Sequence, residues 1–398
     1  MSLQNKEVLI TGIGLVSCYG EGADHHWETL GGETAPAPLV NLDIVPPYGV
    51  HPLPEMDWAQ QIPRKDQRQM ENWQRLGTYA AGLALDDANL KENEDLLRTM
   101  DLVVAAGGGE RDVATDEAIM RDAVTSNDRE ALLLERLPSD LRPTLFLAQL
   151  SNLLAGNISI VHKVTGSSRT YMGEETAGVT VLDNALKRIS SGQSTHMLVG
   201  GSYNADRPDA LLPHVLGHYV YDGGDKHGVH GRQSNGGGMR MGSVGAFLVL
   251  EDADHAKARG AKAYAKLSAV SSDLGTRNGN QATARMDRMI DAIGLSSAPD
   301  AILSGSTGVS DATRFEMDYL AARFGAETPV RAYQTLIGQP LEANFPAGVA
   351  LAALALHKGG FYAPFEDVEK PTAKSVDNIV VTCIGHVCGE GFARIEKA

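Results

Sequence analysis

The chain has 398 residues, 43% of them hydrophobic, and 35 Lys and Arg against 50 Asp and Glu give it a formal net charge of −15. This acidic balance argues against nucleic-acid binding, because no basic block is present to meet a phosphate backbone. Three cysteines without metal-ligand spacing or a disulfide pattern favour a reducing, cytoplasmic environment. No apolar run approaches the length of a membrane-spanning helix and no leader pattern opens the chain, so we expect neither a membrane span nor export.

The first 109 residues predict a strand, a loop-rich excursion, a helix and a second strand. Residues 7–17 form an apolar run with a TGIG turn, which lacks the GxGxxG spacing of a dinucleotide site. Residues 27–63 are rich in proline, which favours a loop. Residues 67–89 place apolar side chains on one helical face, and residues 102–109 are typical of a buried strand that ends in glycines.

Two stretches with helical character follow. Residues 112–137 are charged and helical in pattern, and their role is not readable from the sequence. Residues 145–160 are apolar, with Phe146 near their start, and they favour a helix packed in the core.

Residues 166–201 have the pattern of a strand, a sharp turn, a helix and a second buried strand. Gly173 marks the turn, and residues 176–189 carry apolar side chains at helical spacing. Unpaired N–H groups at such a helix N-terminus favour negative charge, and nucleophile-elbow enzymes hold a Ser or Cys there. In this chain Glu174 and Glu175 take that place.

Residues 205–238 contain four histidines among glycines and aspartates. A metal site needs ligands that are held in a fixed array. Because these histidines show no helical register, we expect a solvated flexible loop and no metal site. The four residues are His214, His218, His227 and His230.

The second half of the chain repeats the first in outline. Alternating strands and helices favour parallel sheets that are covered by helices on both faces. Strands are expected over 244–252, 264–270, 301–304, 330–337 with its turn, and 378–384, and helices over 253–262, 283–293, 314–324 and 347–357.

Residues 157–189, NISIVHKVTGSSRTYMGEETAGVTVLDNALKRI, resemble the nucleophile segment of the β-ketoacyl-acyl-carrier-protein synthases, the condensing enzymes of the thiolase-like superfamily. The TGIG turn and the segments VGAFLVLED and HAKARGAK resemble further parts of this family, so the resemblance covers nearly the whole chain. It implies an α/β protein with a thiolase-like αβαβα five-layer double fold. Its two pseudo-repeated halves would be residues 1–252, with dimer and cap insertions, and residues 253–398.

The same resemblance implies that the four catalytic side chains of the family are replaced. Glu175, followed by Thr-Ala-Gly, stands at the position of the catalytic Cys. Ser304, or Gly305 if the register shifts by one, stands at the first His, before a GTST-like loop. Gln334 and Gln339 stand at the Lys and the second His of the Lys-Ser-x-x-Gly-His motif. We therefore expect condensing activity to be lost, with Glu175 paired to Gln339 or to a backbone N–H.

Further residues are implicated in substrate binding. His386 and Cys388 lie where the family has a Gly-Phe-Gly-Gly loop; a nucleophilic Cys–His pair is one interpretation, and simple replacement within a loop is the other. Ser306 and Thr307 match family residues that bond the pantetheine arm of the carrier protein. Phe146 has two interpretations. By resemblance it falls in the family's segment that packs at the dimer interface and lines the partner's acyl tunnel, and by its apolar neighbours it belongs to a core helix.

Relatives of the family that lack the Cys act as chain-length-factor partners of an active ketosynthase in fatty-acid or polyketide synthesis, and we expect this function first. Gln is the usual substitute for the Cys there, and Glu175 departs from that. Two alternatives stay open: an active 3-oxoacyl-[acyl-carrier-protein] synthase with unusual residues, and a malonyl-binding or decarboxylating pseudoenzyme that uses Glu175. The expected partners are an acyl carrier protein and a second subunit, identical or active. No cofactor is expected beyond the carrier protein's phosphopantetheine.

Overall fold

The computed structural model describes residues 6–277, 279–372 and 375–398. Its main sheet is continuous and has two halves of the same design, which we call the first and the second sheet. β3 (Asn41–Val45) and β4 (Tyr48–Val50) form a separate two-stranded sheet. In each half of the main sheet three strands run parallel to one another, and the next two pair antiparallel. The first sheet has the spatial order β6 (Ser168–Tyr171), β5 (Asp101–Ala105), β7 (His196–Tyr203), β8 (Val244–Asp252) and β1 (Val8–Ser17).

The second sheet repeats this order with strands from the C-terminal part of the chain. Its spatial order is β11 (Val330–Ala332), β10 (Ala301–Ser304), β12 (Asn378–Ile384), β13 (Glu390–Glu396) and β9 (Ala265–Asp273). Numbered within its own half, each sheet therefore has the order third, second, fourth, fifth, first. The two sheets join where β1 pairs with β9 at Leu9 and Ile10.

The sheets are mixed, so the expectation of parallel sheets is wrong for two strand pairs in each half. All nine residues of β8 are buried, so its sequence lacks the alternation that marks an antiparallel strand with one wet face. β13 is absent from the sequence-based expectations. It pairs antiparallel with both β12 and β9, and therefore lies inside its sheet.

Two helices form the central layer between the sheets. α9 (Glu175–Ser190) contacts β5 and β7 of the first sheet and β9 of the second, and α16 (Asn344–Lys358) contacts β8 and β12. The first thirteen residues of α16 are all buried, and its many alanines let the backbone approach strands on both sides. The largest hydrophobic cluster of the protein lies here.

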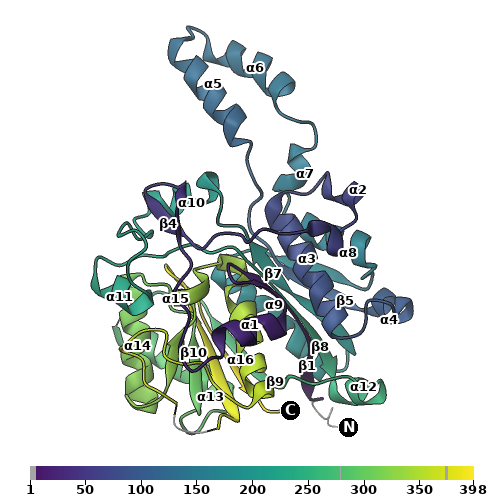
Figure 1. Ribbon diagram of the computed structural model, residues 1–398, viewed down its shortest axis with the longest axis vertical. Helices are drawn as coiled ribbons and strands as arrows, with labels where there is room; N and C mark the ends of the chain where they lie inside the picture. Colours follow the sequence, from purple (N-terminus) through teal and green to yellow (C-terminus); the bar gives the residue numbers. More distant parts are fainter. Residues whose placement is uncertain (1–5, 278, 373–374) are drawn as a thin grey trace.

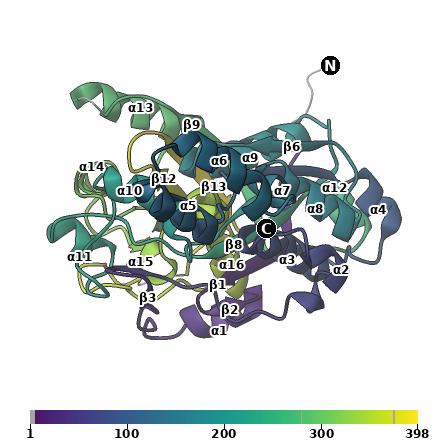
Figure 2. The same ribbon diagram turned by 90° about the horizontal axis from the view of Figure 1, so that it is seen from above.

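Further helices cover the outer faces and complete the five layers (Figures 1 and 2). α3 (Asn72–Asp87) and α8 (Leu153–His162) share a core with the first sheet, and α13 (Gly279–Ala292) and α14 (Ser310–Phe324) share one with the second. The predicted helix 67–89 begins later, because Glu71 and Gln74 form a capping box at the start of α3.

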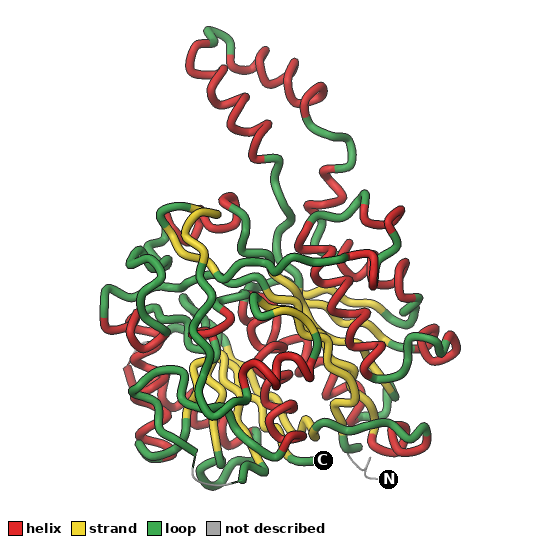
Figure 3. Tube along the Cα trace, in the orientation of Figure 1, coloured by secondary structure: helices red, strands yellow, loops and turns green. Residues whose placement is uncertain are grey.

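One feature departs from the layered body. α5 (Val113–Thr125) and α6 (Arg129–Asp140) form a hairpin that projects away from it (Figures 1 and 3). Within the described ranges, no helix combines the length and apolar character needed to cross a membrane. The remaining elements are β2 (Gly20–Glu21), α1 (Ala23–Leu30), η1 (Trp58–Gln60), α2 (Arg64–Gln67), α4 (Glu94–Thr99), α7 (Leu145–Gln149), α10 (Pro208–Leu216), α11 (Val229–Ser234), α12 (Ala253–Ala258), α15 (Gln334–Ile337) and η2 (Leu341–Ala343).

Candidate functional site

The turn between β6 and α9 presents two carboxylates to different surroundings. Gly173 has φ 139°, and Glu174, at the N-cap of α9, has φ 51°, a left-handed conformation that non-glycine residues seldom adopt. Glu175 is the first residue of the helix, in agreement with the prediction that it lies at a helix N-terminus. The Glu175 side chain is 3% exposed, whereas that of Glu174 is 48% exposed.

Glu175 lies at the centre of a buried hydrogen-bond network. Its Oε1 accepts from Gln339 Nε2 at 2.9 Å, from the His386 backbone N–H at 3.2 Å and from His386 Nδ1 at 2.9 Å. Gln334 Nε2 in turn donates to Gln339 Oε1 at 3.3 Å. The fold thus brings together three of the predicted positions, and the expected pairing of Glu175 with Gln339 is observed.

The charge of Glu175 is matched by His386. Burial would raise the pKa of Glu175, but hydrogen bonding and charge from His386 outweigh burial and lower that pKa. Burial would likewise lower the pKa of His386, and the hydrogen bond and charge of Glu175 raise it instead. The arrangement favours a carboxylate beside an imidazolium.

Ser304 belongs to a separate polar cluster. Its Oγ contacts Ser306 Oγ at 2.7 Å and donates to Glu316 Oε1 at 2.8 Å, and Thr382 also donates to Glu316. Burial raises the pKa of Glu316, although these hydroxyls oppose the shift. The Ser304 side chain therefore does not join the Glu175 network, whereas the carbonyl of Gly305, the alternative position, accepts from Gln334 Nε2 at 2.8 Å.

The two residues predicted to bond a pantetheine arm are already engaged. Ser306 Oγ donates to Glu316 Oε2 at 2.7 Å, and Thr307 Oγ1 accepts from the backbone N–H of Val309 at 3.2 Å. Both side chains are buried. Their role toward a carrier protein stays a prediction.

The three cysteines differ in burial and in distance from this site, and Cys383 Sγ lies 3.8 Å from the Glu175 carbonyl oxygen. Cys18 and Cys383 are buried, and burial raises the pKa of Cys18 to about 12 and that of Cys383 well above its ordinary value. Cys388 is exposed, whereas His386, two residues away, points inward and is buried. Among the contacts of the described chain, no hydrogen bond joins Cys388 to His386.

A cavity of about 620 Å³ opens beside the N-terminus of α9. Glu174 and His214 are part of its wall, together with the glycine run 107–109 and Arg207. His214 was expected in a solvated loop, and this is wrong: it lies on α10 and is only 7% exposed. Pro208 at the first turn of α10, followed by Leu211 and Val215, is the helical signal that could have revealed it.

Glu342, also in the wall of the cavity, is a titratable group that the sequence reading missed. It is 4% exposed, and burial, reinforced by the charges of Glu174 and Glu175, raises its pKa from 4.5 to about 7. Between these values the folded protein holds the proton more tightly than the unfolded chain, so the free energy of unfolding falls as pH rises through this window.

We therefore expect Glu342→Gln to remove this loss of stability. Relative to the parent protein, the variant should be about equally stable at pH 5 and up to about 3 kcal/mol more stable at pH 8, because the parent must ionise a buried carboxyl there. Urea unfolding of both proteins at the two pH values measures the difference. An equal loss in both proteins would show that Glu342 is not the group that titrates.

Phe146 lies outside this network, on α7. Its neighbours Leu145 and Ala148 are buried, and the Trp73 indole N–H donates to the Ala148 carbonyl at 3.3 Å. Phe146 itself is 59% exposed. The single helix expected over 145–160 is divided into α7 and α8. α8 packs in the core as expected, whereas α7 buries one face only and presents an aromatic ring to the outside on the other.

Comparisons with known proteins agree with this architecture. The family "Beta-ketoacyl synthase, N-terminal domain" matches residues 5–256. 3-oxoacyl-[acyl-carrier-protein] synthase 2 of Vibrio harveyi is 25% identical over 273 residues, 67% of this chain and 62%, less than two thirds, of that protein. The tetracenomycin polyketide synthase ketoacyl synthase beta subunit of Streptomyces glaucescens is 25% identical over 373 residues, 88% of this chain and 85% of that one. The structure titled "The ishigamide ketosynthase/chain length factor" matches with a TM-score of 0.78 and 18% identity over 99% of this chain and 100% of that chain, which confirms the thiolase-like fold.

Proposed function

The chain belongs to the β-ketoacyl synthase family, and from this premise we propose that it is a non-condensing partner subunit of an active ketosynthase. In this role it takes part in fatty-acid or polyketide synthesis on an acyl carrier protein. It shapes the acyl tunnel of the complex and carries no acyl group itself.

The observation that carries the proposal is the carboxylate at the start of α9. Condensation needs a thiolate that takes the acyl chain as a thioester, and a helix N-terminus favours such a thiolate. Glu175 fills that place and is held by Gln339 and His386. A hydrogen-bonded carboxylate does not form a thioester, and the two glutamines at 334 and 339 offer neither the charge of Lys nor the basicity of His.

Two further observations support a partner role. The chain is similar over most of its length to two polyketide synthase proteins, the tetracenomycin beta subunit over 373 residues and a putative oxytetracycline beta-ketoacyl synthase over 371, which favours an assembly of the polyketide type. β6 lies at the edge of the first sheet with one side unpaired by the described strands, which leaves backbone groups available to a second subunit. The proposed complex needs no cofactor of its own, because the phosphopantetheine arm comes with the carrier protein.

We expect the purified chain to remain free of acyl groups when it is incubated with an acyl-carrier-protein thioester. Intact-mass spectrometry followed by peptide mapping measures this, with a ketosynthase that has an intact Cys as the positive control. Co-expression with that ketosynthase should yield a heteromeric complex on size-exclusion chromatography. An acyl adduct on Cys388, or on either other cysteine, would contradict the proposal and favour an active synthase.

The decarboxylating alternative predicts a different result. A homodimer of this chain alone would release carbon dioxide from malonyl carrier protein, and Glu175→Gln would stop the release. We expect the parent protein to release no more carbon dioxide than the Glu175→Gln variant does.

A further inference from the structure

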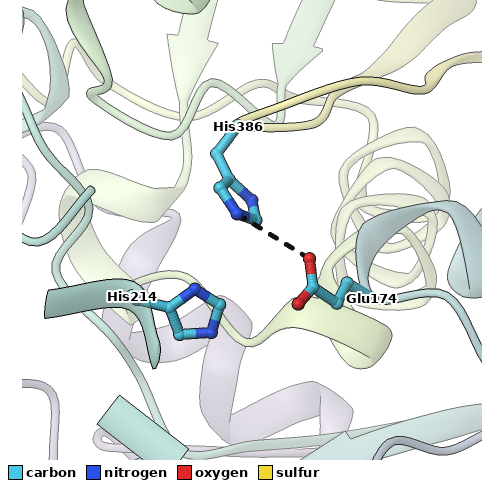
Figure 4. A group of neighbouring side chains, drawn as sticks. All are labelled: Glu174, His214 and His386. Carbon is cyan, nitrogen blue, oxygen red and sulfur yellow. Dashed lines mark ion pairs between the residues drawn. The ribbon is translucent and has the colours of Figure 1, made fainter. Parts of the chain in front are cut away.

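Three metal-ligating side chains from distant parts of the chain meet beside the cavity, and two of them, Glu174 and His214, line it. Glu174 comes from the N-cap of α9, His214 from α10, and His386 from the loop between β12 and β13 (Figure 4). Each offers one ligand atom, and these atoms all lie within 4.8 Å of one another. We infer that Glu174, His214 and His386 bind a divalent metal ion of the Zn²⁺ class, with Glu175 orienting His386 from behind.

Glu174 and His386 form an ion pair (Figure 4), and their spacing also leaves room for a metal ion between them. Glu174 Oε2 lies 3.7 Å from His386 Nε2, beyond hydrogen-bond distance. Two ligand atoms bound to one tetrahedral Zn²⁺ at about 2 Å each lie about 3.4 Å apart. The separation of Glu174 from His386 is therefore close to that needed, and the His214 ligand atom lies within 4.8 Å of the other two.

Glu175 prepares His386 for this role. Its carboxylate accepts from His386 Nδ1 at 2.9 Å, which leaves Nε2 as the nitrogen that faces Glu174. A carboxylate behind a histidine fixes the ring and its tautomer in many metal sites. Tyr219 packs edge-on against the same imidazole, with ring centroids 4.8 Å apart, and restricts it further.

His214 supplies an independent observation. The residue is 93% buried, being 7% exposed, yet neither of its ring nitrogens has a hydrogen-bond partner among the described residues. Its ring stands edge-on to that of His386, with centroids 5.3 Å apart. Neither nitrogen is among the fully buried atoms that lack a partner, because His214 lines the cavity, where a ligand can reach the ring. A bound cation would satisfy one nitrogen and account for its place in the cavity wall.

A second group of one histidine and two glutamates has a structural role that accounts for its position without a metal ion. His230 lies near Glu366 and Glu369. The Glu366 carboxylate already accepts from the backbone N–H groups of His230 and Gly231, and Glu369 accepts from those of Ala332 and Phe365. These carboxylates hold loops in place, whereas Glu174 has no such bonds among the described residues.

Two imidazoles and one carboxylate form a ligand set that suits Zn²⁺ and leaves a coordination position open. Glu174 and His214 are part of the cavity wall, so that position faces the cavity. The oxygen of a carboxylate or thioester carbonyl in the cavity is the class of ligand that it would take. This inference stands apart from the partner role, because binding of the ion needs no second subunit.

The test is Zn²⁺ titration of the full chain after removal of metals with a chelator. Isothermal titration calorimetry should give one Zn²⁺ per chain with a micromolar or lower dissociation constant, and Co²⁺ in its place should give the visible absorption bands of a four-coordinate site. His214→Ala and Glu174→Gln should each weaken binding about 100-fold or more, and Glu175→Gln about 10- to 100-fold.

His218→Ala is the matched control, because His218 is exposed and lies four residues from His214. It should bind Zn²⁺ like the parent protein, and circular dichroism should show that every variant is folded. The inference is overturned if the parent protein binds no Zn²⁺, if His214→Ala binds it unchanged, or if His230→Ala is the variant that abolishes binding.

Discussion

Glu175→Ala is expected to lower the free energy of unfolding by about 3–5 kcal/mol, the range found when one partner of a buried ion pair is removed. The Glu175 and His386 side chains are 3% and 4% exposed, so water does not replace the lost partner. The substitution removes the nearer of the two carboxylates that face His386, leaving only the half-exposed Glu174 at 3.7 Å, and it leaves the Gln339 amide without its acceptor. Urea unfolding measures the loss.

Glu174→Ala is the matched control, because it changes the same residue type at the neighbouring position. Its side chain is 48% exposed, so in metal-free buffer we expect a change within about 0.5 kcal/mol. Glu175→Gln should be intermediate, because it keeps the shape of the side chain and loses the charge. Equal effects at 174 and 175 would mean that the buried network does not stabilise the fold.

The network explains which parts of the site could be predicted from sequence. Glu175 and Gln339 are 164 residues apart, yet each lies in a short motif with fixed spacing, at a helix N-terminus or after a Gly turn. The helix N-terminus and the Gly turn can each be predicted from a few neighbouring residues, and the double fold then brings the two motifs together. The helix itself was expected over 176–189 and extends over Glu175–Ser190, because its apolar spacing is regular.

The histidine part of the site could not be predicted in this way. His214, His386 and Glu174 converge from three segments that share no motif, so only their packing in three dimensions reveals the cluster. The glycines around residues 217–238 also masked the helical pattern of α10. The antiparallel direction of β8 could not be predicted for a related reason. A strand that is buried on both faces lacks the alternation of apolar and polar residues that marks an antiparallel strand with one wet face.

α7 provides a physical link between the cavity and the outer surface. Gln149, at the end of α7, lines the cavity, and the Ser151 hydroxyl, just after α7, donates to the Gly107 carbonyl of the glycine run at 2.6 Å. Phe146, on the same helix, points outward and is 59% exposed. In the proposed complex this ring would lie against the partner and close the end of its acyl tunnel.

In a complex with an active ketosynthase, Phe146→Ala is therefore expected to lengthen the main acyl product by at least one condensation cycle, because removal of the ring leaves space for further carbons. Phe146→Trp should shorten it. Mass spectrometry of the chains released from the carrier protein measures both, with size-exclusion chromatography to show that each complex is intact. Met120→Ala is the control, since Met120 is an exposed apolar residue on the projecting hairpin, and it should leave the product unchanged. An intact complex that makes the same chains with Ala, Phe or Trp at position 146 would show that this residue does not limit their length.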